Sequence, residues 1–335
     1  EYLGPAPGPG QSRLEQVRRL RAWIARAETF IRDHLDDFDV VHALSGFHAT
    51  MKPAHTASTL GLPAVIFLTL AHGDLADKGR LQRLLGTARR RRAMARTIDA
   101  LVAMSDEMDA ELRSYGIPDD RIVRIPMGID TTRFHPATPE ERTRLRTEYG
   151  WPDRLTLIFS GRIDPRKRPH LVVEAIIQAT AAGIDAQAVL LGPEGDDAYV
   201  AGMRRRADDA GVADRIIWYG FTPDPAPVLR AADLYALPSS HEGMPAAVAE
   251  ASATGLPALV TAISGCTDIV ADGETGRWIE PTAESIGSAV IDYARDVGMR
   301  DAHAAAARER AVSKFSLDVV LGQYEALFRR LMARG

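Results

Sequence analysis

Short apolar runs that alternate with stretches of helical periodicity are the feature that most constrains the fold of this chain. The runs are rich in Val, Ile, Leu and Ala and cover 39–44, 64–70, 100–104, 121–125, 156–159, 188–191, 216–219, 233–237 and 258–261. Helical stretches lie at 12–36, 78–97, 105–115, 139–149, 168–182, 197–210 and 245–254, and beyond Pro281 at 283–297, 300–314 and 316–333. Continuous apolar strands that alternate with helices predict an α/β fold whose parallel sheets are covered on both faces.

A polar stretch with two prolines, 134–139, separates the two series of runs. The length of 335 residues suits about two domains. We therefore predict two doubly wound, Rossmann-like domains: an N-terminal one at 1–137, joined by the C-terminal helix 316–335, and a second one at 138–315. The first series is short of strands for a doubly wound half, so we expect the missing front strands to precede Glu1.

Composition and short motifs narrow the classes of function. The net charge of −4 gives no electrostatic argument for nucleic acid. The single cysteine, Cys266, leaves no disulfide within the chain and no cysteine-based zinc site, which fits a reducing, cytoplasmic compartment. The dinucleotide-binding and P-loop motifs are missing, which argues against a dehydrogenase or a kinase.

Four consecutive arginines, Arg89, Arg90, Arg91 and Arg92, lie on a predicted helix that also carries apolar residues. Clustered cations of this kind attract anionic lipid. Two interpretations stay open: a solvated helix face, and a weak peripheral contact with the inner face of the membrane.

Glycines, histidines and charged residues gather just after the predicted strands. Examples are His42, His48, His72, Gly161, Arg162, Gly192, Gly220 and Glu242. Ligands of open α/β sheets bind outside the carboxyl ends of the strands, and two such sheets that face one another would line a cleft from both sides. We therefore expect a small-molecule site at these strand ends.

The most informative of these strand ends is the stretch 239–250, which follows a buried strand and opens a helix. Gly243 lets the backbone approach a ligand, and Pro245 suits the first helical turn, whose free N–H groups attract anions. Glu242 lies in the turn, and Glu250 lies about 7 Å beyond Pro245 along the helix. One carboxylate near an anion and another a ribose-length away suit a nucleotide-diphosphate sugar. The alternative is a capped amphipathic helix with two solvated glutamates.

A second cluster joins a strand to a helix at 161–167. Arg162 and Lys167 would converge there on a diphosphate and neutralise it as a metal does elsewhere. The chain uses arginine almost everywhere, and its only lysines are Lys52, Lys78, Lys167 and Lys314. The retention of a lysine at 167 favours a need for an ammonium group, whereas the alternative is an ordinary surface cation.

Together these residues resemble a known family. The spacing of Glu242 and Glu250 is similar to the E-x7-E motif of GT-B retaining glycosyltransferases of the family-four group, also described as glycosyl transferases group 1. Further similar segments, in the family's order, are 39–42, 125–130, 159–162 with Lys167, 190–193, 218–221, 232–239, 254–257, Gly265 and 272–276. The resemblance spans about 39–330 and is most specific in the second half.

The resemblance implies a role for each matching position. Glu250 would hold the ribose hydroxyls; Glu242, with the backbone at Gly243, Met244 and Pro245, would hold the donor sugar and its phosphates; Arg162 and Lys167 would stabilise the departing diphosphate; Gly161 and Gly192 would line the donor; the backbone at Phe221 and Thr222 would meet the base; and His72 would lie near the reacting sugar. Neither a metal nor another cofactor is expected.

Four departures from the family pattern are visible. Leu44 stands where a second histidine is common, Met127 replaces the asparagine of a proline-asparagine-glycine turn, and Asp268 replaces a glutamate. The glycine-rich loop that normally opens the first domain is not in the sequence. A chain without it would bind donor yet turn over poorly.

The sequence thus predicts a metal-independent retaining glycosyltransferase, which moves a sugar from a nucleotide donor to an acceptor hydroxyl on a glycan, a lipid or a small molecule. Two alternatives remain: a GT-B phosphorylase or epimerase, and a nucleotide-sugar-binding module with little catalysis. The sequence names neither the base, the sugar nor the acceptor.

Overall fold

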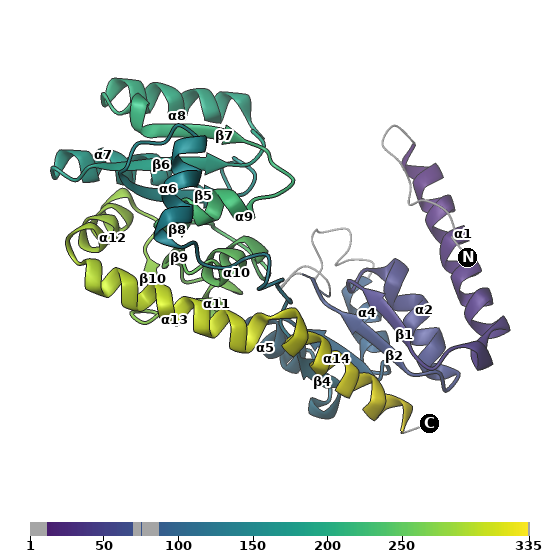
Figure 1. Cartoon of the computed structure of the whole chain (residues 1–335). Coiled ribbons are helices and arrows are strands. Elements are labelled where there is room, and N and C mark those ends of the chain that lie inside the picture. The colour runs from purple at the N-terminus through teal and green to yellow at the C-terminus, as the bar shows by residue number, and fades with distance from the viewer. Residues whose placement is uncertain (1–11, 70–74, 76–86, 334–335) are drawn as a thin grey trace. The chain divides into compact units, whose positions relative to one another are not determined.

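The computed structural model describes residues 12–69, 75 and 87–333, and the statements below concern those residues. The chain forms two compact units, unit 1 (Glu1–Pro126 and Leu321–Gly335) and unit 2 (Met127–Val320) (Figure 1). The division falls earlier than the predicted boundary after residue 137. The reason is that Ile129 pairs with the chain at 315–317, since its N–H bonds to Phe315 O at 2.7 Å and its carbonyl accepts from Leu317 N at 3.0 Å.

Unit 1 contains a sheet whose four strands are parallel and lie in chain order. They are β1 (Val41–Leu44), β2 (Ala64–Phe67), β3 (Ala100–Ala103) and β4 (Ile122–Arg124), each within or next to a predicted run. Its helices are α1 (Arg13–Asp33), η1 (Leu35–Asp37), α2 (His48–Thr59), α4 (Thr87–Ala95), α5 (Asp106–Ser114) and η2 (Asp119–Arg121). The remainder of the predicted helix 78–97 lies outside the described residues.

Helix α2 was not predicted, because Pro53 lies inside it and its sequence is rich in histidine and threonine. Burial explains why it forms all the same. Met51, Ala54 and Ala57 are completely inaccessible to solvent, so packing of this face outweighs the poor intrinsic propensity.

Unit 2 contains a sheet whose six strands run parallel in the order β10-β9-β8-β5-β6-β7. The strands are β5 (Leu155–Ser160), β6 (Ala186–Leu191), β7 (Ile216–Gly220), β8 (Leu234–Leu237), β9 (Ala258–Thr261) and β10 (Gly276–Ile279). The helices are α6 (Pro139–Glu148), α7 (His170–Ala181), α8 (Asp197–Asp209), η3 (Ala213–Arg215), α9 (Ala226–Arg230), α10 (Ala246–Ala253), α11 (Cys266–Ile269), α12 (Ala283–Arg295) and α13 (Val297–Phe315).

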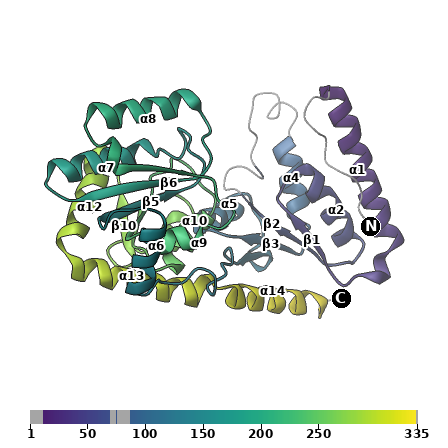
Figure 2. The ribbon, with the colours of Figure 1, turned by 45° about the horizontal axis from the view of Figure 1, so that its top comes forward.

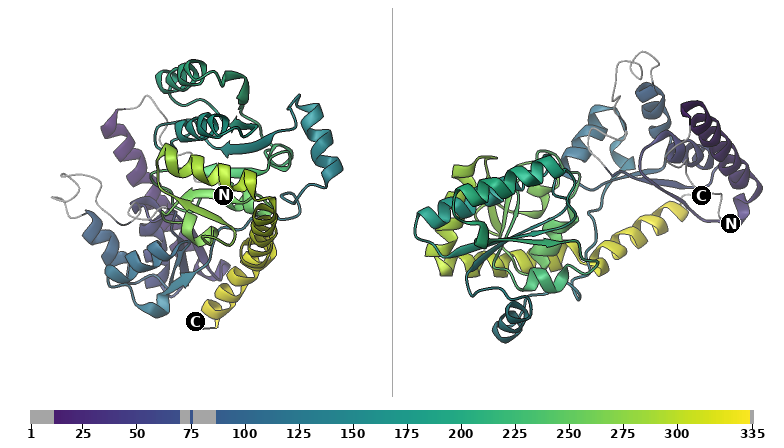
Figure 3. Two further views of the ribbon diagram at one scale, coloured as in Figure 1. Left: turned by 90° about the vertical axis from the view of Figure 1, so that its left-hand side faces the viewer. Right: turned by 90° about the horizontal axis from the view of Figure 1, so that it is seen from above.

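The helices of unit 2 cover its sheet on both faces (Figure 2, Figure 3). Helix α7 packs against α8 and α12, whereas α10 packs against α11 and α13. Right-handed crossovers account for this, because the chain moves along the sheet in one direction after β5 and in the other after β8. Two aromatic side chains at the centre, Phe159 and Tyr235, are completely buried.

Helix α14 (Leu317–Met332) begins in unit 2 and continues into unit 1. Its Tyr324 and Phe328 rings lie 5.7 and 5.8 Å from the His42 ring on β1. The C-terminal segment therefore belongs to unit 1 from Leu321 onward rather than from the predicted residue 316.

Within the described ranges, no helix is both long and apolar enough to cross a membrane. The arginine run on α4 is only partly exposed: Arg89 and Arg90 face solvent, Arg91 is buried, and the Arg92 guanidinium stacks on the Tyr115 ring at 3.7 Å. A peripheral membrane contact through this run stays a prediction, and it would rest mainly on two side chains.

Candidate functional site

The strand order of unit 2 reverses between β5 and β8, which pair directly through Leu157 and Leu234. At such a switch point the connections leave in opposite directions and open a crevice outside the carboxyl ends of the strands. Both sequence clusters follow these two strands: 161–167 comes after β5, and 239–250 comes after β8. The fold therefore brings the two clusters to one place.

A contact between the two clusters confirms that they meet. Lys167 Nζ lies 2.9 Å from Glu242 Oε1, and the two side chains are only 14% and 11% exposed. Ser239 Oγ donates to the same carboxylate oxygen at 2.7 Å. An ammonium carries three donors, so one bond to Glu242 leaves Lys167 able to bind an anion as well.

Arg166, rather than Arg162, is the second cation beside Glu242. Its Nη1 donates to His241 O at 2.7 Å and lies 3.3 Å from Glu242 Oε1. Within the described part of the chain, exposed Arg162 has no ion-pair partner, and its side chain lies against Gly195. Sequence reasoning missed Arg166, and no spacing rule separates it from its neighbours; only the contact with the 239–242 turn identifies it.

The loop that carries Lys167 is held in a defined conformation. The Lys167 N–H donates to Asp164 Oδ1 at 3.1 Å, and Arg168 adopts a left-handed conformation with φ 52°. Ser240 N and Oγ both donate to Arg166 O, at 2.9 and 3.0 Å, so the 239–242 turn is bonded to this loop. A non-glycine residue such as Arg168 rarely adopts the left-handed conformation, and it keeps that conformation only where surrounding contacts hold it.

Two glycines allow backbones to approach one another closely at the site. Gly192 follows β6 with φ 140°, and a Cβ there would lie 2.0 Å from Gly161 O. Gly265 has φ 74°, and a Cβ there would lie 2.2 Å from Gly243 O. Neither position has room for a side chain.

Helix α10 begins at Ala246, one residue later than predicted, so Pro245 is its N-cap at φ −75° and ψ 105° rather than part of the first helical turn. Gly243, Met244 and Pro245 are buried. Glu250 is half-buried on the same helix, and burial raises the pKa of its carboxyl, while the positive charge of Arg133 acts in the opposite direction. A raised carboxyl pKa means that the folded chain bears a cost for keeping this carboxylate ionised.

The remaining predicted residues lie in less enclosed places. Phe221 is 73% exposed, and the Thr222 hydroxyl accepts from Asp224 N at 3.2 Å, in the loop between β7 and α9. His72 lies outside the described residues. In unit 1, His42 packs against the rings of Tyr324 and Phe328, and burial lowers its pKa. No group of three or more metal-ligating side chains occurs among the described residues.

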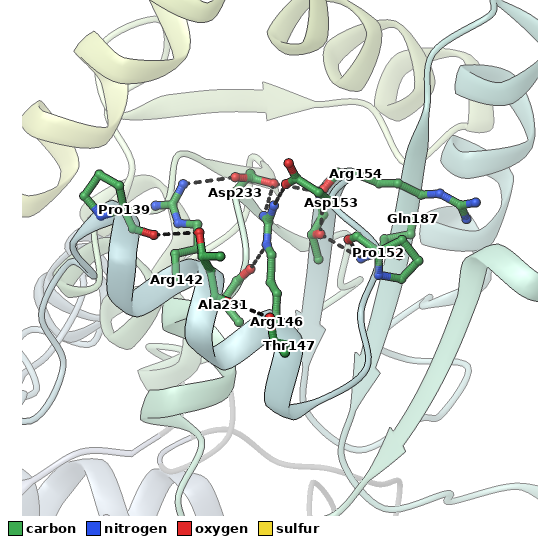
Figure 4. Close-up of polar contacts among 12 residues, drawn as sticks. Pro139, Arg142, Arg146, Thr147, Pro152, Asp153, Arg154, Gln187, Ala231 and Asp233 are labelled. Atoms are coloured by element: carbon green, nitrogen blue, oxygen red, sulfur yellow. Dashed lines mark hydrogen bonds and ion pairs between the residues drawn. The ribbon is translucent and has the colours of Figure 1, made fainter.

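A cavity of about 700 Å³ lies at the amino ends of the same strands, beside the residues that precede β5 and β8 (Figure 4). Arg146 is buried there and spans Asp233 Oδ2 at 2.6 Å and Ala231 O at 2.9 Å. Arg142 pairs with the other Asp233 oxygen at 3.1 Å. Carboxylates already neutralise these arginines, so the network holds α6 on the sheet. It is separate from Lys167 and Glu242, which lie beyond the carboxyl ends of the strands.

Two family models match the chain. Residues 141–310 match the model for glycosyl transferases group 1, and residues 2–133 match the model for glycosyltransferase family 4. The first match covers half of the chain and contains both clusters. The chain belongs to the glycosyl transferases group 1 family.

Curated relatives carry related activities in their names. A D-inositol 3-phosphate glycosyltransferase of Segniliparus rotundus is 31% identical over 68% of this chain and 50% of its own length. A GDP-mannose-dependent alpha-(1-6)-phosphatidylinositol monomannoside mannosyltransferase of Mycolicibacterium smegmatis is 29% identical over 59% of this chain and 53% of its own length. The chain thus spans about half the length of these two relatives.

Solved structures of the same kind show that the fold is the two-domain α/β fold of GT-B glycosyltransferases. The Anabaena protein HepE, solved in complex with UDP, matches with a TM-score of 0.79 and 19% identity over 92% of this chain and 82% of that one. A sucrose-phosphate synthase of Thermosynechococcus elongatus matches with a TM-score of 0.76 and 20% identity over 98% and 82%.

Proposed function

We propose that this family member transfers a sugar, with retention of anomeric configuration and without a metal, from a nucleotide-diphosphate sugar to an acceptor hydroxyl. The observation that carries the proposal is the contact of Lys167 with Glu242 at the switch point of unit 2. It places a cation, a carboxylate and the start of α10 at the edge where ligands of such sheets bind.

In this proposal the cations act on the leaving group. Negative charge grows on the diphosphate as the bond to the sugar breaks, and Lys167 with Arg162 would stabilise it in place of a metal. Arg166 holds the Glu242 turn in position through His241 O. Because Lys167 is bonded in advance to Glu242, its ammonium needs little reorganisation when the diphosphate arrives.

The remaining site residues would bind the donor. Glu242 and the backbone of Gly243, Met244 and Pro245 would hold the sugar and its phosphates, lined by Gly161 and Gly192; Glu250 would hold the ribose; the backbone at Phe221 and Thr222 would meet the base; and His72 would lie near the reacting sugar. The developing charge on the sugar has oxocarbenium character, as in glycoside hydrolysis.

The acceptor is proposed from chemistry shared by the relatives. The names of two of them contain an inositol compound, D-inositol 3-phosphate in one and phosphatidylinositol monomannoside in the other. We propose a hydroxyl of an inositol-containing or glycan acceptor for this chain.

A thermal-shift panel tests the donor half first. UDP, GDP and ADP sugars should be compared, and at a hundredfold excess over Kd a true ligand stabilises by about 2.7 kcal/mol. One of these nucleotide sugars is expected to raise the melting temperature. If none does, the proposal is wrong at its first step.

A transfer assay tests the rest. Product from D-inositol 3-phosphate and the preferred donor should keep the donor's anomeric configuration by NMR and should persist in EDTA. Loss of activity in EDTA would contradict the metal-independent mechanism. Donor binding without release of nucleotide would favour a binding module, and transfer of the sugar to inorganic phosphate would favour a phosphorylase.

A further inference from the structure

Arg133 binds the loop 221–225, in which Phe221 and Thr222 are predicted to meet the base of the donor. Its Nε and Nη2 lie 3.2 and 2.9 Å from the same oxygen, Asp224 Oδ1, and Nη2 also donates to Pro223 O at 3.3 Å. The guanidinium thus holds both the side chain and the main chain of the loop 221–225. A fork of donors aimed at one loop restricts its conformation more than a single ion pair does.

The orientation of Arg133 is itself fixed by a tight turn. Asp130 Oδ1 accepts from Thr132 N at 3.0 Å, from Thr132 Oγ1 at 2.6 Å and from Arg133 N at 3.0 Å. These bonds lower the pKa of the Asp130 carboxyl, so it stays ionised over the neutral range. The turn thus fixes the backbone from which the Arg133 side chain reaches the loop.

The loop is largely exposed, and its other hydrogen bonds among the described residues are local: the Thr222 hydroxyl accepts from Asp224 N at 3.2 Å and donates to Asp224 O at 3.3 Å. Phe221 is 73% exposed, and Pro223 and Asp224 are exposed as well. Asp224 Oδ1 also accepts from Ala226 N at 3.3 Å, which ties the loop to the start of α9. Because apolar packing is sparse, the polar grip on Asp224 sets the conformation of the loop.

Arg133 also acts on the predicted ribose carboxylate. Its positive charge favours the ionised form of Glu250, opposing the effect of burial on that carboxyl. One side chain thus influences both the loop that would receive the base and the carboxylate that would receive the ribose.

We propose that Arg133 is a positioning residue for the nucleoside half of the donor, and that through Asp224 it holds the 221–225 loop in the conformation that receives the base. This inference rests on the proposed function. It assigns the diphosphate to Lys167 and the nucleoside to the Arg133–Asp224 pair, so the two halves of the donor are separable by mutation.

The test measures binding of UDP, GDP and inorganic pyrophosphate by calorimetry. For Arg133→Ala we expect the better nucleoside diphosphate to bind about five- to tenfold more weakly while pyrophosphate binds as before. Asp224→Ala should give a similar loss, and the double variant should lose little more, because either change breaks the same contact. In turnover, Arg133→Ala should raise the donor KM and leave kcat within about twofold.

Arg206→Ala is the matched control, because Arg206 is similarly exposed and pairs with Glu174 between α7 and α8 in the same unit. This variant should bind all three ligands as the unaltered chain does. Equal weakening of pyrophosphate and nucleotide in Arg133→Ala, or no weakening of either, would overturn the inference. Failure of the unaltered chain to bind any of UDP, GDP and ADP would instead overturn the proposed function.

Discussion

At the scale of single residues, the candidate site holds two glutamates in different environments. Glu242 is almost enclosed and is surrounded by the donors of Lys167, Arg166 and Ser239. Glu250 is half-buried without a bonded cation among the described residues, and only the charge of Arg133 offsets the burial. The donors around Glu242 stabilise its carboxylate, whereas ionised Glu250 lowers the stability of the folded chain. A buried carboxylate that lowers stability is characteristic of a group with a role in binding.

Replacement of Lys167 by Ala is expected to lower kcat/KM about 100- to 1000-fold, because a preorganised charge at the leaving group is lost. Steady-state kinetics with the preferred nucleotide sugar measure this. Lys314→Ala, which alters an exposed lysine on α13, is the control and should leave kcat/KM unchanged. An unchanged kcat/KM in Lys167→Ala would remove its role in leaving-group stabilisation.

Glu250→Gln is expected to weaken nucleotide binding and yet stabilise the fold at neutral pH. The folded-state pKa of Glu250 lies above its unfolded value, so the folded chain binds the extra proton, and stability falls as pH rises between these two values. The glutamine variant lacks this fall. Melting curves from pH 4 to 8 should show the two proteins diverging as pH rises, with the variant higher; a variant that is less stable at pH 7 would contradict the assignment.

At the scale of elements, the backbones that follow β5 and β6 approach one another closely. Gly192→Ala is expected to destabilise unit 2 by more than about 2 kcal/mol, because its Cβ would lie 2.0 Å from the carbonyl oxygen of Gly161. Gly211→Ala is the control for backbone strain alone, since its φ is 68° but nothing lies within 4 Å of the added Cβ. That change should cost about 1 kcal/mol. Equal losses in calorimetric unfolding would remove the steric explanation.

The ion-pair network under α6 makes a separate prediction about stability. Arg146→Ala should cost about 3 kcal/mol, because it removes the shortest of three bonds to the Asp233 carboxylate, which is only 9% exposed, and also the bond to Ala231 O. Arg144→Ala, on the exposed face of the same helix, should change stability by less than about 0.5 kcal/mol. Denaturant unfolding of the two variants distinguishes them, and similar values would show that the buried pair contributes no more than a surface pair.

The same elements show what the sequence could predict. The predicted strands are confirmed. Strands β2, β3, β5, β6, β8 and β9 are buried almost throughout, which is why they appear in the sequence as continuous apolar runs, whereas β1, β4 and β7 are partly exposed. Strand β10 was missed because it is an edge strand that starts at a glycine and exposes 43% of Trp278. The cluster 161–167, with Lys167, and the cluster 239–250, with Glu242 and Glu250, were predictable from motif spacing. The grip of Arg133 on Asp224 was not, because it joins residues 91 positions apart and depends on the folded geometry.

At the scale of the whole molecule, ligand binding should leave a footprint confined to a few segments. We expect added UDP or GDP to slow hydrogen exchange at 161–167, 221–226 and 239–250, because these backbones would become less open to local unfolding. Pyrophosphate should protect only the first and last of these segments. Protection by pyrophosphate at 221–226 would contradict the division of the donor between Lys167 and Arg133.

Helix α14 has a practical consequence for anyone who divides this chain. Unit 1 is made of two separate pieces of sequence, and Tyr324 and Phe328 from the second piece cover His42 in the first. An expression clone that stops after residue 126 would leave those rings behind and expose the face of β1 that they cover. One that runs from residue 127 to residue 335 would carry the Tyr324 and Phe328 rings without His42 to pack against. A stable half-molecule is therefore either residues 127–320 alone, or unit 1 with a linker that joins residue 126 directly to residue 321.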